Sequence, residues 1–279
     1  MRRMLAQCVP PFVRDAVRSV LRPEYRRERR LLRAVAKVPP RRRFSVSFLG
    51  RQLEVVDSRS FAPMYAEIFG REIYKFRTSV TDPLIIDAGA NIGLGLIYLK
   101  RLYPAAKVVA FEADPRIFEV LRLNVERFGL TDVTLHNKAV AGHDGHVRFV
   151  AEGTDSGRIA SESKGEQTCD VEATRLRHFL QHDVHLLKMD IEGAETQVLL
   201  DCRDLLVNVE NLFVEYHSFA GREQNLPELL ALLKAAGFRL YIYSVADAWP
   251  TPLFERPGGW AMDLQLNIFG FRDSWRPRN

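Results

Sequence analysis

Residues Leu84–Gly95 read L-I-I-D-A-G-A-N-I-G-L-G, and they constrain the fold more than any other stretch of the chain. An apolar run of strand length reaches Asp87, a glycine-containing turn follows, and a helical pattern then lasts until Pro104. Open α/β sheets bind nucleotides at such a unit. Its glycines let the backbone approach the ligand, and the N-terminus of the helix points its amide groups at it. The stretch therefore predicts a cofactor site on an α/β sheet.

Apolar strands and helical segments alternate through the rest of the chain. We expect strands at 84–88, 107–111, 133–135, 185–189, 209–216, 238–245 and 264–271, a hairpin of 147–150 and 167–171 with a polar loop at 152–165, and helices at 91–102, 115–128, after Gly193 and at 227–236. Asp114 and Pro115 are typical of a helix start, and Gly129 of a helix end. This alternation predicts a mostly parallel sheet with helices on both faces, and an antiparallel pairing of the last two strands.

The basic charge of the chain lies at its N-terminus. Residues 1–43 hold fourteen Lys or Arg and three Asp or Glu, a balance of +11. Because the net charge of the whole chain is +5, residues 44–279 together carry −6. An amphipathic helix is predicted at 12–21, and a second Arg-rich run precedes Pro39. Two alternatives stay open, namely helices that cap the main domain, and a basic surface for peripheral contact with anionic lipid or an acidic partner. Few aromatic residues interrupt the tract, which disfavours nucleic acid as a partner.

Residues 44–80 form a second predicted segment. Alternating apolar residues over 44–57 indicate a hairpin that turns at Gly50-Arg51, and 64–76 resembles a short helix followed by aromatic residues. These aromatics either wall the cofactor site or belong to the core. We therefore divide the chain into a helical extension (1–43), a hairpin and helix cap (44–80) and a main domain (81–279).

Bulk properties exclude several protein classes. No apolar run approaches the roughly 18 residues of a membrane span, and the first residues lack the apolar segment of a secretory signal. Three widely spaced cysteines, Cys8, Cys169 and Cys202, argue against a disulfide framework or a zinc knuckle. We expect a cytoplasmic protein, and we assign no oligomeric state.

Acidic residues stand at the ends of three predicted strands, namely Asp87, Glu112 and Asp190. The carboxyl ends of parallel strands line one crevice, so these side chains should converge there. Glu112 lies 25 residues after Asp87, near the spacing at which an acid binds ribose hydroxyls. A dinucleotide fingerprint would need glycine at 91 and 94, where the chain has Asn91 and Leu94. A nicotinamide cofactor is therefore disfavoured.

Four motifs in order resemble one known family. D-A-G-A-N-I-G-L-G at 87–95, F-E-A-D-P at 111–115, L-L-K-M-D-I-E-G-A-E at 186–195 and V-E-Y-H at 214–217 are similar to the FkbM family of S-adenosylmethionine-dependent methyltransferases. The resemblance covers residues 60–220. It implies a seven-stranded, Rossmann-like class I methyltransferase fold, S-adenosylmethionine as cofactor, and methylation of a hydroxyl on a sugar, glycolipid or natural product.

The resemblance also implies roles for individual residues. Asp87, Gly89, Asn91 and Gly93 would surround the methionine and ribose, Glu112 would bind the ribose hydroxyls, residues 137–139 would border the adenine, and Asp190 would face the sulfonium. The full cofactor set is Asp87, Gly89, Ala90, Asn91, Gly93, Glu112, Ala113, Asn137, Ala139 and Asp190. Carboxylates suit this cofactor, because it carries an ammonium and a sulfonium group.

Methylation of a hydroxyl also benefits from a general base. The candidates are His217, Glu215, Asp190 and Glu192, and His217 is preferred because an ordinary histidine pKa near ~6.5 suits proton removal at neutral pH. The alternative for His217 is a satisfied histidine at a strand end. We assign no metal site, although Asp190 and Glu215 could together hold a divalent cation.

The segment 249–263 contains Trp249, Phe254, Trp260 and three prolines. It is either a flap that selects the acceptor or a loop that covers the sheet edge. For the whole chain we predict an S-adenosylmethionine-dependent O-methyltransferase. A cofactor-binding module without activity and an NAD-linked reductase are the alternatives.

Overall fold

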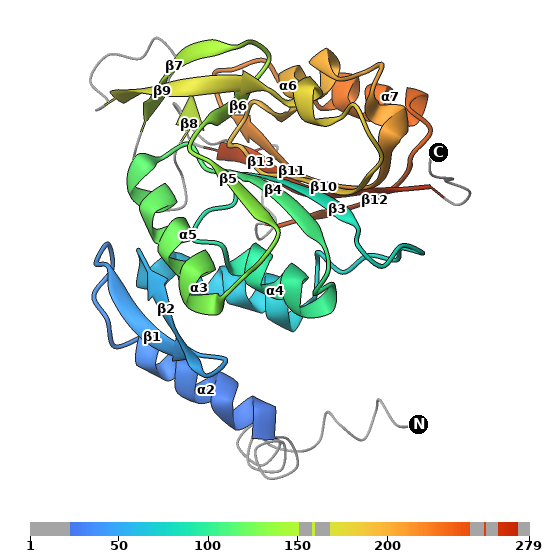
Figure 1. Cartoon of the computed structure of the whole chain (residues 1–279). Coiled ribbons are helices and arrows are strands. Elements are labelled where there is room, and N and C mark those ends of the chain that lie inside the picture. The colour runs from blue at the N-terminus through green and yellow to red at the C-terminus, as the bar shows by residue number, and fades with distance from the viewer. Residues whose placement is uncertain (1–22, 151–157, 160–167, 246–253, 255–261, 273–279) are drawn as a thin grey trace.

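The computed structural model describes residues 23–150, 158–159, 168–245, 254 and 262–272, and its centre is a seven-stranded sheet (Figure 1). The strand order is β12-β13-β11-β10-β3-β4-β5. All neighbouring strands are parallel except that β13 runs antiparallel to both β11 and β12. The expected sheet and the antiparallel pairing of its last two strands are thus confirmed. Insertion of β13 between β11 and β12 gives the expected seven-stranded, mostly parallel α/β fold.

The strands of this sheet are β3 (Leu84–Ala88), β4 (Lys107–Phe111), β5 (Val133–His136), β10 (Val184–Met189), β11 (Val209–Phe219), β12 (Arg239–Ser244) and β13 (Met262–Phe271). Helices α4 (Leu94–Leu102) and α5 (Pro115–Phe128) cover one face, and α6 (Glu195–Asp201) and α7 (Leu226–Ala235) cover the other (Figure 1). Each face has its own apolar core, with Ile85, Leu96 and Phe213 in one and Leu187, Val198 and Leu229 in the other. The carboxyl ends of β3, β4, β10 and β11 therefore stay free to form a site.

A smaller four-stranded sheet stands beside the main one, in the order β6-β9-β7-β8. It contains β6 (Ala139–Ala141), β7 (Gly145–Val150), β8 (Arg158–Ile159) and β9 (Thr168–Arg175). The pairing of β7 with β9 confirms the predicted hairpin, whereas β6 is too short to stand out in the sequence. Most of the predicted polar loop at 152–165 lies outside the described residues, but its residues 158–159 form β8, a strand that was not predicted.

The N-terminal part of the described chain packs onto α5 and α3 (Ser58–Tyr65) (Figure 1). It consists of α2 (Pro23–Val35) and a hairpin of β1 (Phe44–Phe48) and β2 (Arg51–Val55). Leu31 and Val35 of α2 are buried in the apolar core on the face of the sheet that α4 and α5 cover. The apolar side of α2 is thus covered by the protein itself, as the capping alternative expects. The helix predicted at 12–21 lies outside the described residues, and the division at 43 and 80 stays a prediction.

Asn124 on α5 connects the hairpin to the main domain through hydrogen bonds. Its side chain accepts a hydrogen bond from the amide of Glu54 at 2.8 Å and donates to the carbonyls of Glu54 and Ile92 at 2.9 and 2.8 Å. The residue is fully buried, so water cannot replace these bonds. Asn124 therefore links β2, α5 and the loop after β3.

We expect Asn124→Ala to lower the free energy of unfolding by roughly 2–3 kcal/mol, because it leaves buried backbone groups unpaired. Chemical denaturation of both proteins measures the difference. Glu119→Ala, on the exposed side of the same helix, is the matched control and should lose little stability. Equal stability of Asn124→Ala and wild type would contradict the role of this link.

Three of the predicted boundaries that differ from the structure have a local backbone cause. The helix predicted at 64–76 begins at Ser58, since Asp57 caps it by accepting from the Arg59 amide at 3.0 Å, and it ends in a π-helical turn, η1 (Ala66–Gly70). The helix predicted at 91–102 begins at Leu94, because Asn91 and Gly93 adopt positive φ. The hairpin turns at Leu49 and Gly50, so Arg51 already belongs to β2.

Among the described residues, no helix combines the length and the apolar character that crossing a membrane would require.

Candidate active site

The loop after β3 is held in an unusual backbone conformation. Gly89 has φ +85°, and a β-carbon at this position would lie 1.8 Å from the backbone carbonyl oxygen of Asp190. Only glycine permits so close an approach of the loops after β3 and β10. Asn91 follows at φ 50°, in the left-handed region that asparagine tolerates better than most residues. The sequence therefore brings the two strand ends into direct contact.

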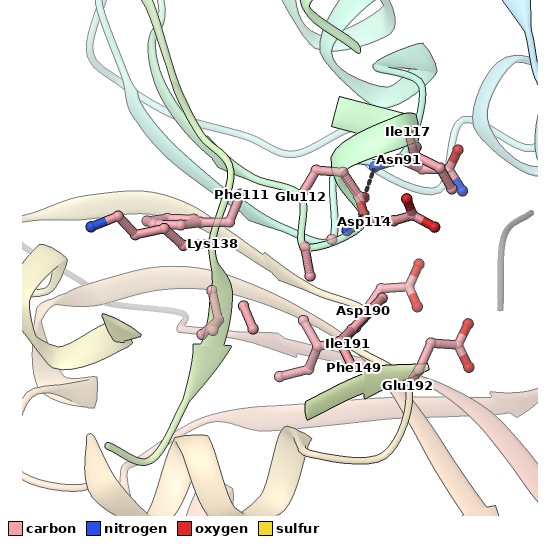
Figure 2. Close-up of a pocket in the computed structure, with 14 residues that line it drawn as sticks. Asn91, Phe111, Glu112, Asp114, Ile117, Lys138, Phe149, Asp190, Ile191 and Glu192 are labelled. Atoms are coloured by element: carbon pink, nitrogen blue, oxygen red, sulfur yellow. Dashed lines mark hydrogen bonds between the residues drawn. The ribbon is translucent and has the colours of Figure 1, made fainter. Parts of the chain in front are cut away.

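Glu112 follows β4 and closes the same loop. One of its carboxylate oxygens accepts a hydrogen bond from the Asn91 amide at 2.9 Å, and the other accepts one from the Asp114 amide, also at 2.9 Å (Figure 2). Asn137 donates to the carbonyls of Glu112 and Ala113 at 2.8 and 3.2 Å, and so holds this turn from the β5 side. The carboxylate is thus fixed in one position at the rim of the pocket.

The first pocket lies beside Glu112. Phe111 and Lys138 lie at one end of it, and the carboxylates of Glu112, Asp114, Asp190 and Glu192 lie at the other (Figure 2). Its lining comprises Gly89, Asn91, Phe111, Glu112, Ala113, Asp114, Ile117, Lys138, Ala139, Val140, Phe149, Asp190, Ile191 and Glu192. Phe149 comes from β7, so the small sheet forms part of the wall of this pocket. A flat apolar group with an attached diol would fit this lining.

A second pocket adjoins the first and shares Gly89, Asn91, Asp190 and Glu192 with it. Five acids line it, namely Glu67, Asp87, Asp190, Glu192 and Glu215, together with one lysine, Lys188. Tyr74, Met64 and Ile68 also line it, so the segment around η1 does form a wall of the site. Acids outnumber the single lysine in this pocket, so it favours ligands that donate hydrogen bonds or carry positive charge.

Lys188 is the buried cation of the second pocket. Its ammonium lies 3.2 Å from Asp87 and 3.5 Å from Asp190, and it donates a hydrogen bond to the carbonyl of Gly89. It also lies 6.0 Å from the ring centre of Tyr74. These contacts raise the pKa of Lys188 despite its burial, which alone would lower it. Lys188 therefore stays charged and holds the loops after β3 and β10 together.

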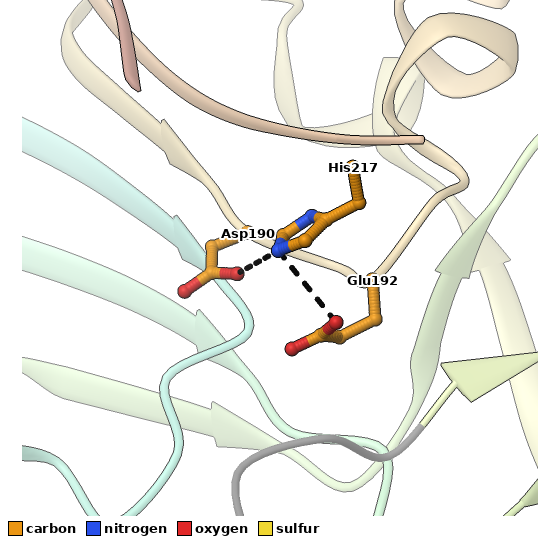
Figure 3. A group of neighbouring side chains, drawn as sticks. All are labelled: Asp190, Glu192 and His217. Carbon is orange, nitrogen blue, oxygen red and sulfur yellow. Dashed lines mark ion pairs between the residues drawn. The ribbon is translucent and has the colours of Figure 1, made fainter. Parts of the chain in front are cut away.

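His217 on β11 lies behind Asp190 and Glu192. Its side chain is only 1% exposed, and its Nδ1 donates to Glu195 at 3.0 Å. Its Nε2 lies 3.6 Å from Glu192, 3.8 Å from Glu215 and 4.0 Å from Asp190 (Figure 3). Four carboxylates thus surround one imidazole at the carboxyl ends of β10 and β11.

Burial raises the pKa values of several acids of the site. It raises the pKa of Glu112 to about 7, although the amides of Asp114 and Asn91 oppose the shift. Burial, together with neighbouring carboxylates, also raises the pKa values of Glu192 and Glu215 to about 8. Burial raises the pKa of Asp87 as well, while Lys188 acts against that rise.

The comparisons with known proteins agree with this geometry. Residues 87–240 match the model of the methyltransferase FkbM domain. The match begins at the carboxylate of β3 and includes both pockets' strand ends, and it spans more than half of the chain. The chain belongs to this family.

Three of the proteins to which this chain is similar are methyltransferases by name. Methyltransferase sdnD of Sordaria araneosa is 31% identical over 217 residues, which cover 63% of this chain and 81% of that protein. The 31-O-demethyl-FK506 methyltransferase FkbM of Streptomyces tacrolimicus is 25% identical over 213 residues, covering 63% and 80%. The 2-O-methyltransferase NoeI of Sinorhizobium fredii is 26% identical over 167 residues, covering 52% and 68%. The chain is similar to each of these methyltransferases.

The reason for preferring His217 as the base of an FkbM enzyme was wrong. Burial alone would lower the pKa of His217, but Glu195, Glu192 and Asp190 raise it to about 10. The imidazole therefore holds its proton near neutral pH and is a poor acceptor. The pKa values of Glu192 and Glu215, raised to about 8, weaken these two acids as proton acceptors near neutral pH in the same way, which leaves Asp190 among the candidates that line the second pocket.

Most of the predicted cofactor residues lie together at the two pockets. Asp87, Gly89, Ala90, Asn91, Glu112, Ala113, Ala139 and Asp190 line one or both. Gly93 lies at the start of α4, where a β-carbon would lie 2.8 Å from Leu121, and Asn137 holds the turn after β4; neither lines a pocket. Both support the site from behind.

Sequence reasoning assigned no role in the site to Lys188, Gln265 or Glu195. Lys188 carried a signal, because a lysine inside an otherwise apolar strand usually has a buried partner. Gln265 pairs with His217 across β11 and β13 and donates to Glu215, a contact that depends on strand register. The flap predicted around Trp249 and Trp260 lies outside the described residues.

Proposed function

We propose that this FkbM-family protein transfers a methyl group from S-adenosylmethionine to a hydroxyl oxygen. The observation that carries the proposal is the pair of adjoining pockets that share Asp190 and Glu192. One pocket combines apolar walls with the fixed carboxylate of Glu112, and the other is lined by acids. A nucleoside that bears a cationic sulfur substituent has the matching chemistry.

The residues present suit this cofactor part by part. The carboxylate of Glu112 would accept hydrogen bonds from the ribose hydroxyls, and Phe111, Ile117 and Ala139 would contact the adenine. Asp87 and Asp190 would attract the ammonium and the sulfonium, with Lys188 setting the position of both carboxylates. Gly89 would let the cofactor approach the backbone, since no side chain stands there.

Bound S-adenosylmethionine supplies an electrophilic methyl group on sulfur. The protein would orient the acceptor oxygen in line with it in the second pocket, and orientation of this kind contributes roughly 7–11 kcal/mol. The hydroxyl proton would pass to the lining carboxylate of Asp190, because the raised pKa values of Glu192 and Glu215 keep those two acids mostly protonated near neutral pH. The names of two relatives, a 2-O-methyltransferase and a 31-O-demethyl-FK506 methyltransferase, support a hydroxyl oxygen as the acceptor.

Calorimetric titration with S-adenosylmethionine and with its demethylated product tests the proposal directly. We expect Glu112→Ala to weaken both affinities by roughly 10- to 100-fold, because hydrogen bonds to a charged group contribute about 1.5–3 kcal/mol. Glu119→Ala, on the exposed side of α5, is the control and should bind as wild type does. Absence of binding to the wild-type protein would reject the proposal.

The raised pKa of Glu112 predicts a pH dependence of cofactor affinity. Below about pH 7 its carboxyl is protonated, and that proton competes with the ribose hydroxyls for the oxygens. Affinity should therefore fall by up to tenfold for each pH unit below about 7 and level off above it. Titrations of the demethylated product between pH 5.5 and 8.5 measure this slope. Glu112→Gln should flatten the slope, and an equally steep slope in that variant would assign it to another group.

A further inference from the structure

The carboxyl ends of β10 and β11 bring one histidine and two acids into the arrangement of a metal site. Asp190 and Glu192 follow β10, and His217 lies on the neighbouring parallel strand β11. One ligand atom from each of these residues lies within 4.8 Å of the other two, and both carboxylates face Nε2 of the imidazole (Figure 3). We infer that His217, Asp190 and Glu192 bind a divalent cation beside the methyl-transfer site.

The spacing around Nε2 of His217 is the first argument. Its distances to Glu192, Glu215 and Asp190 are 3.6, 3.8 and 4.0 Å, and the Gln265 amide nitrogen lies at 3.5 Å. These distances exceed the 2.7–3.2 Å of an ordinary hydrogen bond. They are only slightly longer than the roughly 3–3.6 Å between neighbouring ligands of one ion that are each bound at about 2.0–2.2 Å. A small contraction would therefore complete the coordination.

The orientation of the imidazole is a second, independent argument. Glu195 is buried, with 1% of its side chain exposed, and it accepts the Nδ1 proton of His217 at 3.0 Å. Its own carboxylate is fixed by the amide of Gly193, at 3.0 and 3.1 Å to the two oxygens. A carboxylate behind a histidine is the usual support of a metal ligand, because it sets the tautomer and directs the other nitrogen at the ion. Binding of the cation would release the Nε2 proton.

The donor set indicates the kind of ion. Carboxylate oxygens suit Mg²⁺, Ca²⁺ and Mn²⁺, whereas an imidazole nitrogen favours first-row transition ions. Mn²⁺ is the ion that best suits a site with one nitrogen ligand and several carboxylate oxygens. Asp190 and Glu192 also line the second pocket, so the ion would reach an acceptor placed there. For its role the inference rests on the proposed function: the ion would hold the acceptor hydroxyl oxygen and lower its pKa.

The test uses Mn²⁺ and the full-length protein after chelator treatment and dialysis. We expect electron paramagnetic resonance to count one bound Mn²⁺ per chain, in the absence of cofactor, and Mn²⁺ to raise the melting temperature. His217→Gln and the more exposed Glu192→Gln should each weaken Mn²⁺ binding at least tenfold. The matched control is His178→Gln, whose imidazole pairs with Asp144 at 2.9 Å on the surface, and it should bind Mn²⁺ as wild type does.

Two results would overturn the inference: a folded wild-type protein that binds no Mn²⁺, or undiminished binding by both His217→Gln and Glu192→Gln. The inference and the proposed function fail separately. Methyl transfer at full rate in excess chelator, with no Mn²⁺ bound, would reject the inferred cation site and support the proposed methyltransferase function. If the protein bound Mn²⁺ at this cluster but had no affinity for the demethylated product, the cation site would be supported and the proposed function rejected.

Discussion

Replacing Lys188 with Met should lower the free energy of unfolding by about 3–5 kcal/mol. The substitution keeps most of the volume and removes the ammonium, which lies 3.2 Å from the buried carboxylate of Asp87. Removal of one partner of a buried ion pair leaves the other charge without compensation, and this is more costly than the pair itself. Thermal denaturation should register a fall in melting temperature of roughly 10 °C.

A double variant separates the charge effect from packing. Asp87→Asn combined with Lys188→Met removes both charges, so it should recover a large part of the stability that Lys188→Met loses. Lys107→Met is the matched control, since Lys107 pairs with Asp82 on the surface at 2.9 Å and contributes little there. If Lys188→Met and Lys107→Met lost equal stability, the buried pair would not hold the two loops together.

The fold was predictable because its signals are local. Strands β3 and β4 agree residue by residue with the apolar runs at 84–88 and 107–111, and the start and end of α5 agree with Asp114 and Gly129. These features need only hydrophobic periodicity and capping chemistry. The start of α4 was missed because hydrophobic periodicity does not report φ. Asn91 and Gly93 of A-N-I-G take positive φ, and the helix begins only after them.

The convergence of the strand-end acids was predictable, but their electrostatics and the positions of Lys188 and Gln265 were not. Strand ends bring Asp87, Glu112 and Asp190 to one crevice, and the topology of a parallel sheet is enough to expect this. The pKa of His217 depends instead on Glu195, which folds back from the first turn of α6, and on Glu192. Such contacts come from loop conformation and burial, so a sequence pattern supplied the residue and assigned it the wrong proton chemistry.

The contact between the loops after β3 and β10 leads to the other large effect. Gly89→Ala would place a β-carbon 1.8 Å from the carbonyl oxygen of Asp190, and φ is +85° there. The two loops must separate, because a backbone oxygen cannot turn aside as a flexible side chain does. We expect a loss of about 4 kcal/mol or more in the free energy of unfolding, and loss of cofactor binding, since both loops line the pockets.

Gly50→Ala distinguishes this clash from backbone strain alone. Gly50 has nearly the same φ, +80°, but a β-carbon there would meet nothing within 4 Å. It should therefore lose only the roughly 1–2 kcal/mol of a left-handed residue and bind the demethylated product normally. Denaturation curves and calorimetry on both variants give the comparison. A Gly89→Ala protein as stable as Gly50→Ala would mean that the loops tolerate separation, and that their contact does not define the site.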